Sequence, residues 1–226
     1  FLGFECAASF APALSPPWPD LLIASGRKSI AASRYIKRMS GGETFTVQIQ
    51  DPRIAPKNFD LVAVPNHDPT RGENILVTTA APNRITDKKL TAAKEQFKHF
   101  EDFKGPRIAV LIGGTSKAYK MSSEITRRLA KQLQEVQGSL MITASRRTGT
   151  ENEQILQDAL KNSGHYIWDG SGDNPYFGFL AWADIILVTA DSASMLSEAC
   201  STGKPVYMIP LDGGHPRIDK LHENLR

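Results

Sequence analysis

The sequence has few cysteines, no long apolar segment and little net charge, and each of these absences excludes a class of protein. Two cysteines in 226 residues, Cys6 and Cys200, are too few for a disulfide framework or for a self-sufficient zinc site. The apolar runs are short pieces such as Ile185–Val188, far below the roughly 18 residues of a membrane span. We therefore expect a soluble, cytoplasmic protein with no transmembrane segment, no bound metal and no cofactor.

The charge pattern argues against nucleic acid as a partner. The formal net charge is +3; residues 1–104 hold 14 Lys and Arg against 11 Asp and Glu, and the remaining residues hold 13 against 13. This balance lacks the basic stripe that binding to a phosphate backbone requires.

The chain begins with Phe1, and its opening residues lack the basic segment of a signal peptide. We expect the first domain to be incomplete at its start.

Short apolar runs alternate with amphipathic stretches along the whole chain, which predicts an α/β fold with parallel sheets covered on both faces. Thr86 is placed to cap a helix that carries Leu90 and Phe97 on one side, and Gly105-Pro106 ends it. We therefore expect two Rossmann-like domains, residues 1–104 and 105–226. The strands expected after the break lie at 107–112, 140–143, 166–168, 185–188 and 206–209.

Ligands of open parallel sheets bind outside the carboxyl ends of the strands, so the loops at those ends are the candidate sites. The first loop of the second half contains Gly113, Gly114, Thr115, Ser116 and Lys117. Glycines let a backbone approach an anion, and amides, hydroxyls and a lysine neutralise phosphate oxygens. The alternative is a tight strand-to-helix turn with no ligand.

The next loop carries two adjacent arginines, Arg146 and Arg147, between hydroxyl residues. Guanidinium groups at a strand end suit a phosphate or a carboxylate. The alternative is a solvated edge in which one arginine pairs with an acid.

A short helix near residues 193–202 is the most informative segment. Asp191 or Ser192 is placed to cap it, and Gly203 and Pro205 end it. Its polar side carries small hydroxyl residues, Ser194 among them, and a single carboxylate, Glu198, which leaves room for a ligand. The helix start would face a phosphate, and Glu198 would accept hydrogen bonds from a ribose. The alternative is a lightly polar surface helix.

The first half offers weaker candidates. Ser25–Ser29 follows a strand and opens a helix, which makes it a second candidate anion site. His67 and Asp68 stand at another strand end as candidate catalytic base and orienting acid, against the alternative of a solvated loop. Asp51 and Arg53 are expected to form an internal ion pair.

Seven segments are informative when taken together: IASGRKS (23–29), QDPR (50–53), FDLVAVPNHD (59–68), LIGG (111–114), TASRRT (143–148), NPYFGFL (174–180) and TADS (189–192). They resemble the mitochondrial-fission family named for the plant "elongated mitochondria" protein, over about residues 18–226. The family resemblance implies association with partner proteins at a membrane surface.

The second half is also similar to the donor domain of GT-B glycosyltransferases. That resemblance implies a glycine-rich phosphate loop at Gly113–Ser116, a ribose-binding carboxylate at Glu198 and a following Gly-x-Pro turn at Gly203–Pro205. Lys117 departs from it, because a third glycine usually stands there.

Two functions follow from the resemblances. The first is a metal-independent glycosyltransferase that binds a nucleotide diphosphate-sugar in the interdomain cleft and serves an acceptor, for instance a lipid-linked one. The second is a non-catalytic adaptor that keeps the fold and recruits a partner as a peripheral protein at a membrane surface.

Overall fold

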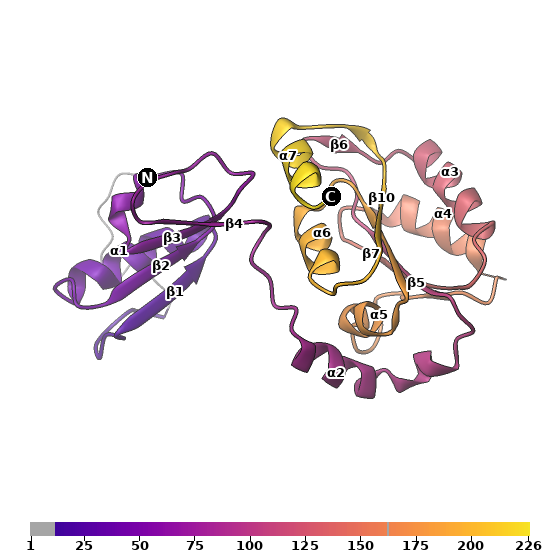
Figure 1. The fold of residues 1–226 in the computed structure, drawn as a ribbon, viewed down its shortest axis with the longest axis horizontal. Coiled ribbons are helices and arrows are strands. Elements are labelled where there is room, and N and C mark those ends of the chain that lie inside the picture. Colours follow the sequence, from indigo (N-terminus) through magenta and orange to yellow (C-terminus); the bar gives the residue numbers. More distant parts are fainter. Residues whose placement is uncertain (1–11, 162) are drawn as a thin grey trace. The chain divides into compact units, whose positions relative to one another are not determined.

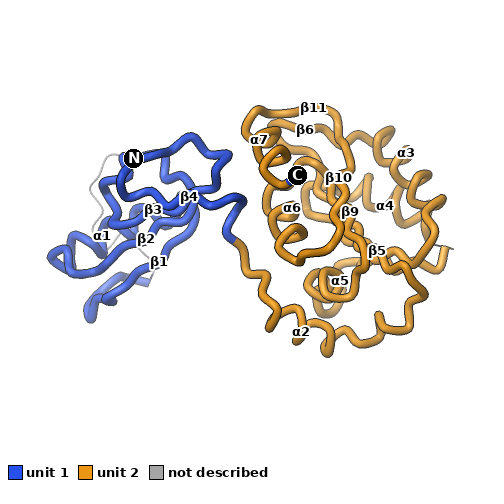
Figure 2. Tube along the Cα trace, in the orientation of Figure 1, with its two compact units in different colours: residues 1–82, 226 blue, residues 83–225 orange. Residues whose placement is uncertain are grey.

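The computed structural model describes residues 12–161 and 163–226, so Cys6 lies outside the described residues. The chain forms two compact units, residues 1–82 with Arg226, and residues 83–225 (Figure 2). Each unit has its own parallel sheet, as expected for two Rossmann-like domains. In the described part of the chain, no helix combines the length and the apolarity needed to cross a membrane.

The first unit is a four-stranded parallel sheet in the order β1-β2-β3-β4 (Figure 1). Its core is small: Phe59, Val62 and Val64 are buried, and Ile30 and Ile75 pack against them. The elements, including two 3-10 turns, are β1 (Leu21–Ser25), Arg27–Ser29, α1 (Ile30–Met39), β2 (Phe45–Ile49), Pro56–Asn58, β3 (Leu61–Pro65) and β4 (Ile75–Thr78).

The second unit is a five-stranded parallel sheet in the order β10-β9-β5-β7-β8. This is the order of a doubly wound sheet, whose ligand crevice lies where the connections change direction, here between β5 and β9. A two-stranded antiparallel pair, β6 with β11, lies beside it. The strands are β5 (Arg107–Ile112), β6 (Tyr119–Lys120), β7 (Ser139–Ala144), β8 (Tyr166–Ile167), β9 (Ile185–Thr189), β10 (Val206–Ile209) and β11 (Asp212–Gly213).

Two apolar clusters cover the two faces of this sheet. One joins β5 and β7 to α3 and α4, and the other joins β5 and β9 to α2, α5 and α6 (Figure 1). The predicted capping residues are confirmed at Thr86 and Ser192, whose hydroxyls accept from Lys89 N and Met195 N. The helices are α2 (Asp87–Gln96), α3 (Ser123–Gln134), α4 (Thr150–Leu160), α5 (Tyr176–Trp182), α6 (Ala193–Cys200) and α7 (Pro216–Asn224), with a 3-10 turn at Lys98–Asp102.

The structure divides the chain between Pro82 and Asn83 rather than near residues 104–106. The reason is that α2 and the turn after it contribute side chains to the core of the second unit, where Phe100 is fully buried. Phe97 packs so closely on α5 that a Cβ added to Gly178 would lie 2.6 Å from its ring. A glycine-proline break ends a local element, but it does not separate two cores.

Candidate functional site

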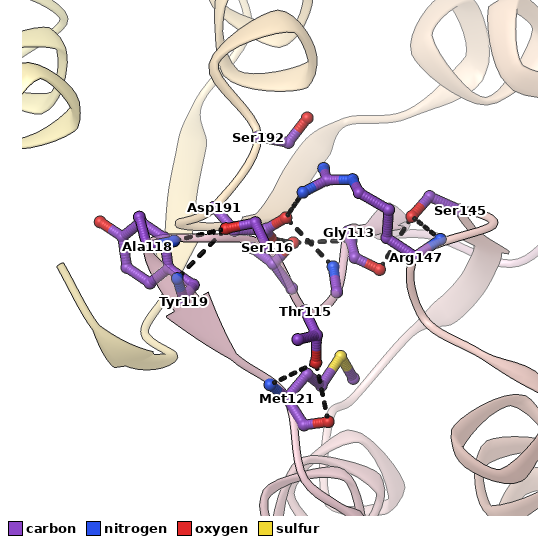
Figure 3. Close-up of polar contacts among 12 residues, drawn as sticks. Gly113, Thr115, Ser116, Ala118, Tyr119, Met121, Ser145, Arg147, Asp191 and Ser192 are labelled. Atoms are coloured by element: carbon purple, nitrogen blue, oxygen red, sulfur yellow. Dashed lines mark hydrogen bonds and ion pairs between the residues drawn. The ribbon is translucent and has the colours of Figure 1, made fainter. Parts of the chain in front are cut away.

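The loops that follow β5, β7 and β9 meet around the carboxylate of Asp191, whose side chain is fully buried. Its Oδ2 accepts from the Gly114 amide at 3.1 Å and pairs with Nη1 of Arg147 at 2.7 Å (Figure 3). Its Oδ1 accepts from the Thr189 hydroxyl at 2.7 Å. A buried charge needs such partners, because water no longer solvates it. Asp191 therefore joins three strand ends at the switch point of the sheet.

The two glycines of the β5 loop allow this close packing. A Cβ on Gly113 would lie 2.2 Å from Oδ1 of Asp191, and one on Gly114 would lie 2.1 Å from the carbonyl oxygen of Arg147. The carbonyl of Gly113 also accepts from the hydroxyls of Ser145 and Thr148. Glycine is thus required at both positions by contacts within the protein.

The backbone amides of this loop are engaged, which corrects the expectation that they form an open phosphate cradle. The Thr115 amide donates to the Arg147 carbonyl at 3.1 Å, and the Ser116 amide donates to the Tyr119 carbonyl at 2.8 Å. The Gly113 amide donates to the Thr189 hydroxyl at 2.7 Å. The short pair of β6 and β11 turns the chain back after Ser116, so the loop does not lead directly into a helix. Lys117 is exposed in this turn.

The two adjacent arginines have different surroundings. Arg147 pairs with Asp191, which confirms the alternative that one arginine meets an acid, yet 40% of its side chain stays exposed. Arg146 lines a separate cavity of about 230 Å³ at the ends of β7 and β8, together with Glu153, Trp168 and Asp169. Arg146 and Arg147 therefore do not act as one charged pair.

Helix α6 begins beside this network with Ser192 as its cap. The Oγ of Ser192 accepts a hydrogen bond from Met195 N at 3.4 Å. Ser192 is buried and Ser194 is exposed in the first turn, which contains no acidic residue. The first amides of a helix have no partner within the helix, and the helix dipole places partial positive charge there. The start of α6 can therefore accept an anion.

Glu198, on the same helix, has a partner that the sequence pattern did not show. The hydroxyl of Tyr176, at the start of α5, donates to Oε2 of Glu198 at 2.6 Å. Burial, together with the hydrogen bond and the charge of Glu198, raises the pKa of Tyr176 well above its usual value. The bond engages Oε2 of this half-buried carboxylate.

The turn after α6 stabilises a neighbouring helix. The ammonium group of Lys204, between Gly203 and Pro205, donates to the carbonyls of Leu180, Ala181 and Ala183 at 2.6–2.7 Å. Three carbonyls at the end of α5 are thus capped by one cation, the charge that a helix end favours.

The weaker candidates of the first unit lie at or after the ends of three different strands: Ser25–Ser29 at the end of β1, Asp51 and Arg53 after β2, and His67 and Asp68 after β3. His67 and Asp68 are half-buried, and the guanidinium of Arg71 donates to the Asp68 and Asn66 carbonyls of the same loop. A catalytic role for His67 and Asp68 stays a prediction. The expected pair of Asp51 and Arg53 is present, with Oδ2 and Nε 3.6 Å apart.

Sequence reasoning missed three side chains that build the site. Thr189 ends β9 and reads as an ordinary strand residue, Tyr176 reads as a core aromatic, and Trp168 ends a short strand. The Trp168 indole donates to the Ser171 carbonyl at 2.8 Å, which fixes its ring beside the cavity of Arg146. In the described part of the chain, no group of three His, Cys, Asp or Glu is placed to hold a metal ion.

Comparison with known proteins identifies a family and a fold. The model of the family described as "Mitochondrial fission ELM1" matches residues 4–226. The mitochondrial fission protein ELM1 of Arabidopsis thaliana is 33% identical, over 92% of this chain and 55% of that protein. An uncharacterised protein of Rickettsia prowazekii is 30% identical, over 84% of this chain and 64% of its own length. The chain thus spans between half and two thirds of these relatives.

Among solved structures, the UDP-GlcNAc 2-epimerase of Neisseria meningitidis, bound to UDP-GlcNAc, superposes with a TM-score of 0.53. It is 16% identical, and the match covers 92% of this chain and 66% of that one. This likeness confirms the expected α/β fold with two parallel sheets of the GT-B-like kind.

Proposed function

The chain belongs to the mitochondrial fission ELM1 family, and we propose that its second unit binds a nucleoside diphosphate-sugar at the carboxyl ends of β5 and β9. One observation carries the proposal. At the switch point of a doubly wound sheet, an arginine with 40% of its side chain exposed is fixed by a buried carboxylate, beside a helix whose first turn has no acidic residue.

The diphosphate would lie between Arg147 and the first turn of α6. One nitrogen of Arg147 is held by Asp191, and the exposed part of the guanidinium can donate to phosphate oxygens. The first-turn amides of α6, near Ser194, supply the remaining donors. Gly113 and Gly114 are needed because they bring Asp191 into place, rather than as the phosphate contacts themselves.

The nucleoside would extend along α6 towards Glu198. Glu198 lies six positions after Ser192, which is about 9 Å along a helix axis. Oε1 of Glu198 would accept from a ribose hydroxyl, beside the hydroxyl of Tyr176. The similar epimerase was solved with a ligand of this class, UDP-GlcNAc.

The test is calorimetric titration with UDP, ADP, GDP and CDP and their sugars. Ser194→Asp adds a negative charge where the diphosphate would lie, while an acid in the first turn favours the helix itself. We expect Kd to rise at least tenfold, which corresponds to about 1.4 kcal/mol. Ser123→Asp, the same change in the first turn of α3, is the matched control and should bind like the wild type. Absence of binding across the panel, or equal affinities of both variants, would refute the proposal.

Whether bound sugar is transferred is a separate question that the same panel answers. Release of nucleoside diphosphate from a nucleotide-sugar, with and without an added acceptor, would identify a glycosyltransferase. Metal-independent transfer is chemically feasible here, because a helix start and an arginine can stabilise a leaving diphosphate.

A specific observation also favours the second candidate, a non-catalytic adaptor. The amides of Gly113, Gly114, Thr115 and Ser116 all have acceptors within the protein, and Tyr176 binds Glu198. A site with so many internal partners can serve as a structural scaffold for partner recruitment at a membrane surface. Nucleotide binding without turnover, or a flat titration, favours this candidate over the transferase.

A further inference from the structure

The first unit contains a cavity of about 640 Å³ whose wall is half cationic and half apolar. Such a volume lies in the range of small-molecule sites. The four cationic residues come from the loop after β1, from α1 and from the loop after β2. The lining residues are Arg27, Lys28, Arg34 and Arg53, with Ile30, Ala31, Pro52 and Ile54.

Two strand-end loops build this cavity. After β1 the chain turns at Gly26, whose φ of +79° is a conformation that glycine adopts without strain. The turn leads through Arg27 into α1, and the side-chain Nε2 of Gln48, on β2, donates to the Gly26 carbonyl at 3.1 Å. After β2, Gln50 and Arg53 both have positive φ values of 77° and 57°, which are uncommon outside glycine and direct the loop over the cavity.

The charged residues that line the cavity are all cationic. Residues 26–42 hold five Lys and Arg and no Asp or Glu. Of these, Lys37 pairs with Asp60 at 2.8 Å and does not line the cavity, while Arg27 and Lys28 are exposed. Arg53 meets Asp51 at 3.6 Å. The wall residues that the structure describes include four cations and no acid. A bound anion would be attracted by this group of cations.

We propose that this cavity binds a phosphate ester that carries an apolar group. Three of the four cations are arginines, whose planar guanidinium matches phosphate oxygens in pairs. The apolar half of the wall, Ile30 and Ile54 among it, contacts the rest of the ligand. A concave site of this size holds one headgroup, whereas nucleic acid needs an extended basic stripe. The assignment concerns the first unit alone and stands apart from the nucleotide proposed for the second.

The test uses three probes on the whole chain: inorganic diphosphate, geranyl diphosphate and phosphatidylcholine vesicles with or without phosphatidic acid. We expect geranyl diphosphate to bind more tightly than inorganic diphosphate. Arg27→Gln and Arg53→Gln should each raise its Kd about tenfold or more, the loss of a charge-assisted hydrogen bond. Lys57→Gln, the same charge change at an exposed site outside the wall, is the control and should bind like the wild type.

Ile54→Ser separates the two halves of the wall. It should weaken the binding of geranyl diphosphate by at least about threefold, since apolar contact with the ligand is lost, and leave the affinity for inorganic diphosphate unchanged. Sedimentation with phosphatidic acid vesicles that depends on Arg53 would identify a lipid headgroup as the source of the phosphate. Binding of geranyl diphosphate without vesicle binding would identify a soluble ester.

Three results would overturn the assignment. The first is that no probe shows saturable binding, and the second is that Arg53→Gln and Lys57→Gln lose affinity for geranyl diphosphate equally. The third is that a short polyglutamate peptide binds as tightly as geranyl diphosphate. Urea unfolding of each variant shows that the first unit stays folded. Because Ser194→Asp leaves this cavity unchanged and Arg53→Gln leaves the second unit unchanged, failure of either proposal is distinguishable from failure of the other.

Discussion

Replacing Tyr176 by phenylalanine removes the hydroxyl that donates to Glu198 across 2.6 Å and leaves the ring in place. A hydrogen bond to a charged group contributes about 1.5–3 kcal/mol to stability. Because Glu198 is half-buried and water can replace part of the bond, we expect the lower end, a loss of about 1.5 kcal/mol. At roughly 2–4 °C for each kcal/mol in a chain of this size, Tm should fall by about 3–6 °C.

The assay is urea unfolding of the wild type, Tyr176→Phe, Glu198→Gln and the double variant. Glutamine keeps an acceptor oxygen but makes only a neutral hydrogen bond, so Glu198→Gln should lose about 1 kcal/mol. The double variant should lose less than the sum of the single losses, since both single changes affect one bond. Unchanged stability of Tyr176→Phe, or strict additivity, would refute the argument that this bond stabilises the second unit.

The same pair makes a prediction about pH. The folded protein raises the pKa of Tyr176, first through burial and then through Glu198. A group with a raised folded pKa contributes stability below its unfolded pKa, about 10 for tyrosine, and loses it as pH rises through the folded value. The stability difference between the wild type and Tyr176→Phe should therefore shrink as the pH rises above about 10.

Nucleotide binding then separates the structural role of Glu198 from its proposed ribose contact. Oε1 of Glu198 stays available in Tyr176→Phe, so the affinity should change by less than about threefold, whereas Glu198→Gln should weaken binding about tenfold. Equal affinities of wild type and Glu198→Gln would end the ribose assignment and leave the stabilising role intact.

Two further predictions concern the second unit. Gly113→Ala places a methyl group 2.2 Å from Oδ1 of Asp191 and should lower the free energy of unfolding by about 1–3 kcal/mol. Gly72→Ala is the control and should change it little, because the nearest neighbour of its methyl group lies at 3.5 Å. Equal losses of the two variants in urea unfolding would contradict this prediction. A hydrogen bond from Arg107 lowers the pKa of Asp184, so this pair stabilises the protein above the unfolded pKa near 3.9 and the contribution fades as pH falls through the folded value. The free energy of unfolding, measured from pH 6 down to pH 3, should therefore fall less steeply in Asp184→Asn than in the wild type. Parallel pH profiles of the two proteins would show that the pair contributes nothing.

The sequence was sufficient for elements with strong local signals. Arg107–Ile112 and Val206–Ile209 are strands at the expected residues, because each is an apolar run bounded by turn formers. The side chains of Thr86 and Ser192 cap helices as expected. These features depend on neighbours within a few residues, and local chemistry determines them.

The parts that were not predictable depend on residues far apart in the chain. Tyr176 and Glu198, which share a hydrogen bond, are 22 positions apart in the chain, and Gly114 and Asp191, which share another, are 77 positions apart. The antiparallel pair of β6 and β11 has only two residues on each side, too few for a period to appear. The same limit explains the boundary, since the helical pattern around Phe97 fixed its apolar side but not the unit against which that side packs.

The glycine-rich loop has the residues that the phosphate-loop prediction required, but its glycines have a different structural role. Close backbone approach is required at Gly113 and Gly114, as the pattern indicated, but the groups that approach are the carboxylate of Asp191 and the carbonyl of Arg147 rather than a phosphate. That carboxylate in turn fixes Arg147 beside the start of α6. A ligand at this edge therefore meets one arginine, with one of its nitrogens already paired, and the amides of a helix start. Under the proposed function, the selectivity of the edge for a diphosphate would rest on those two groups, and the loop would act by positioning them.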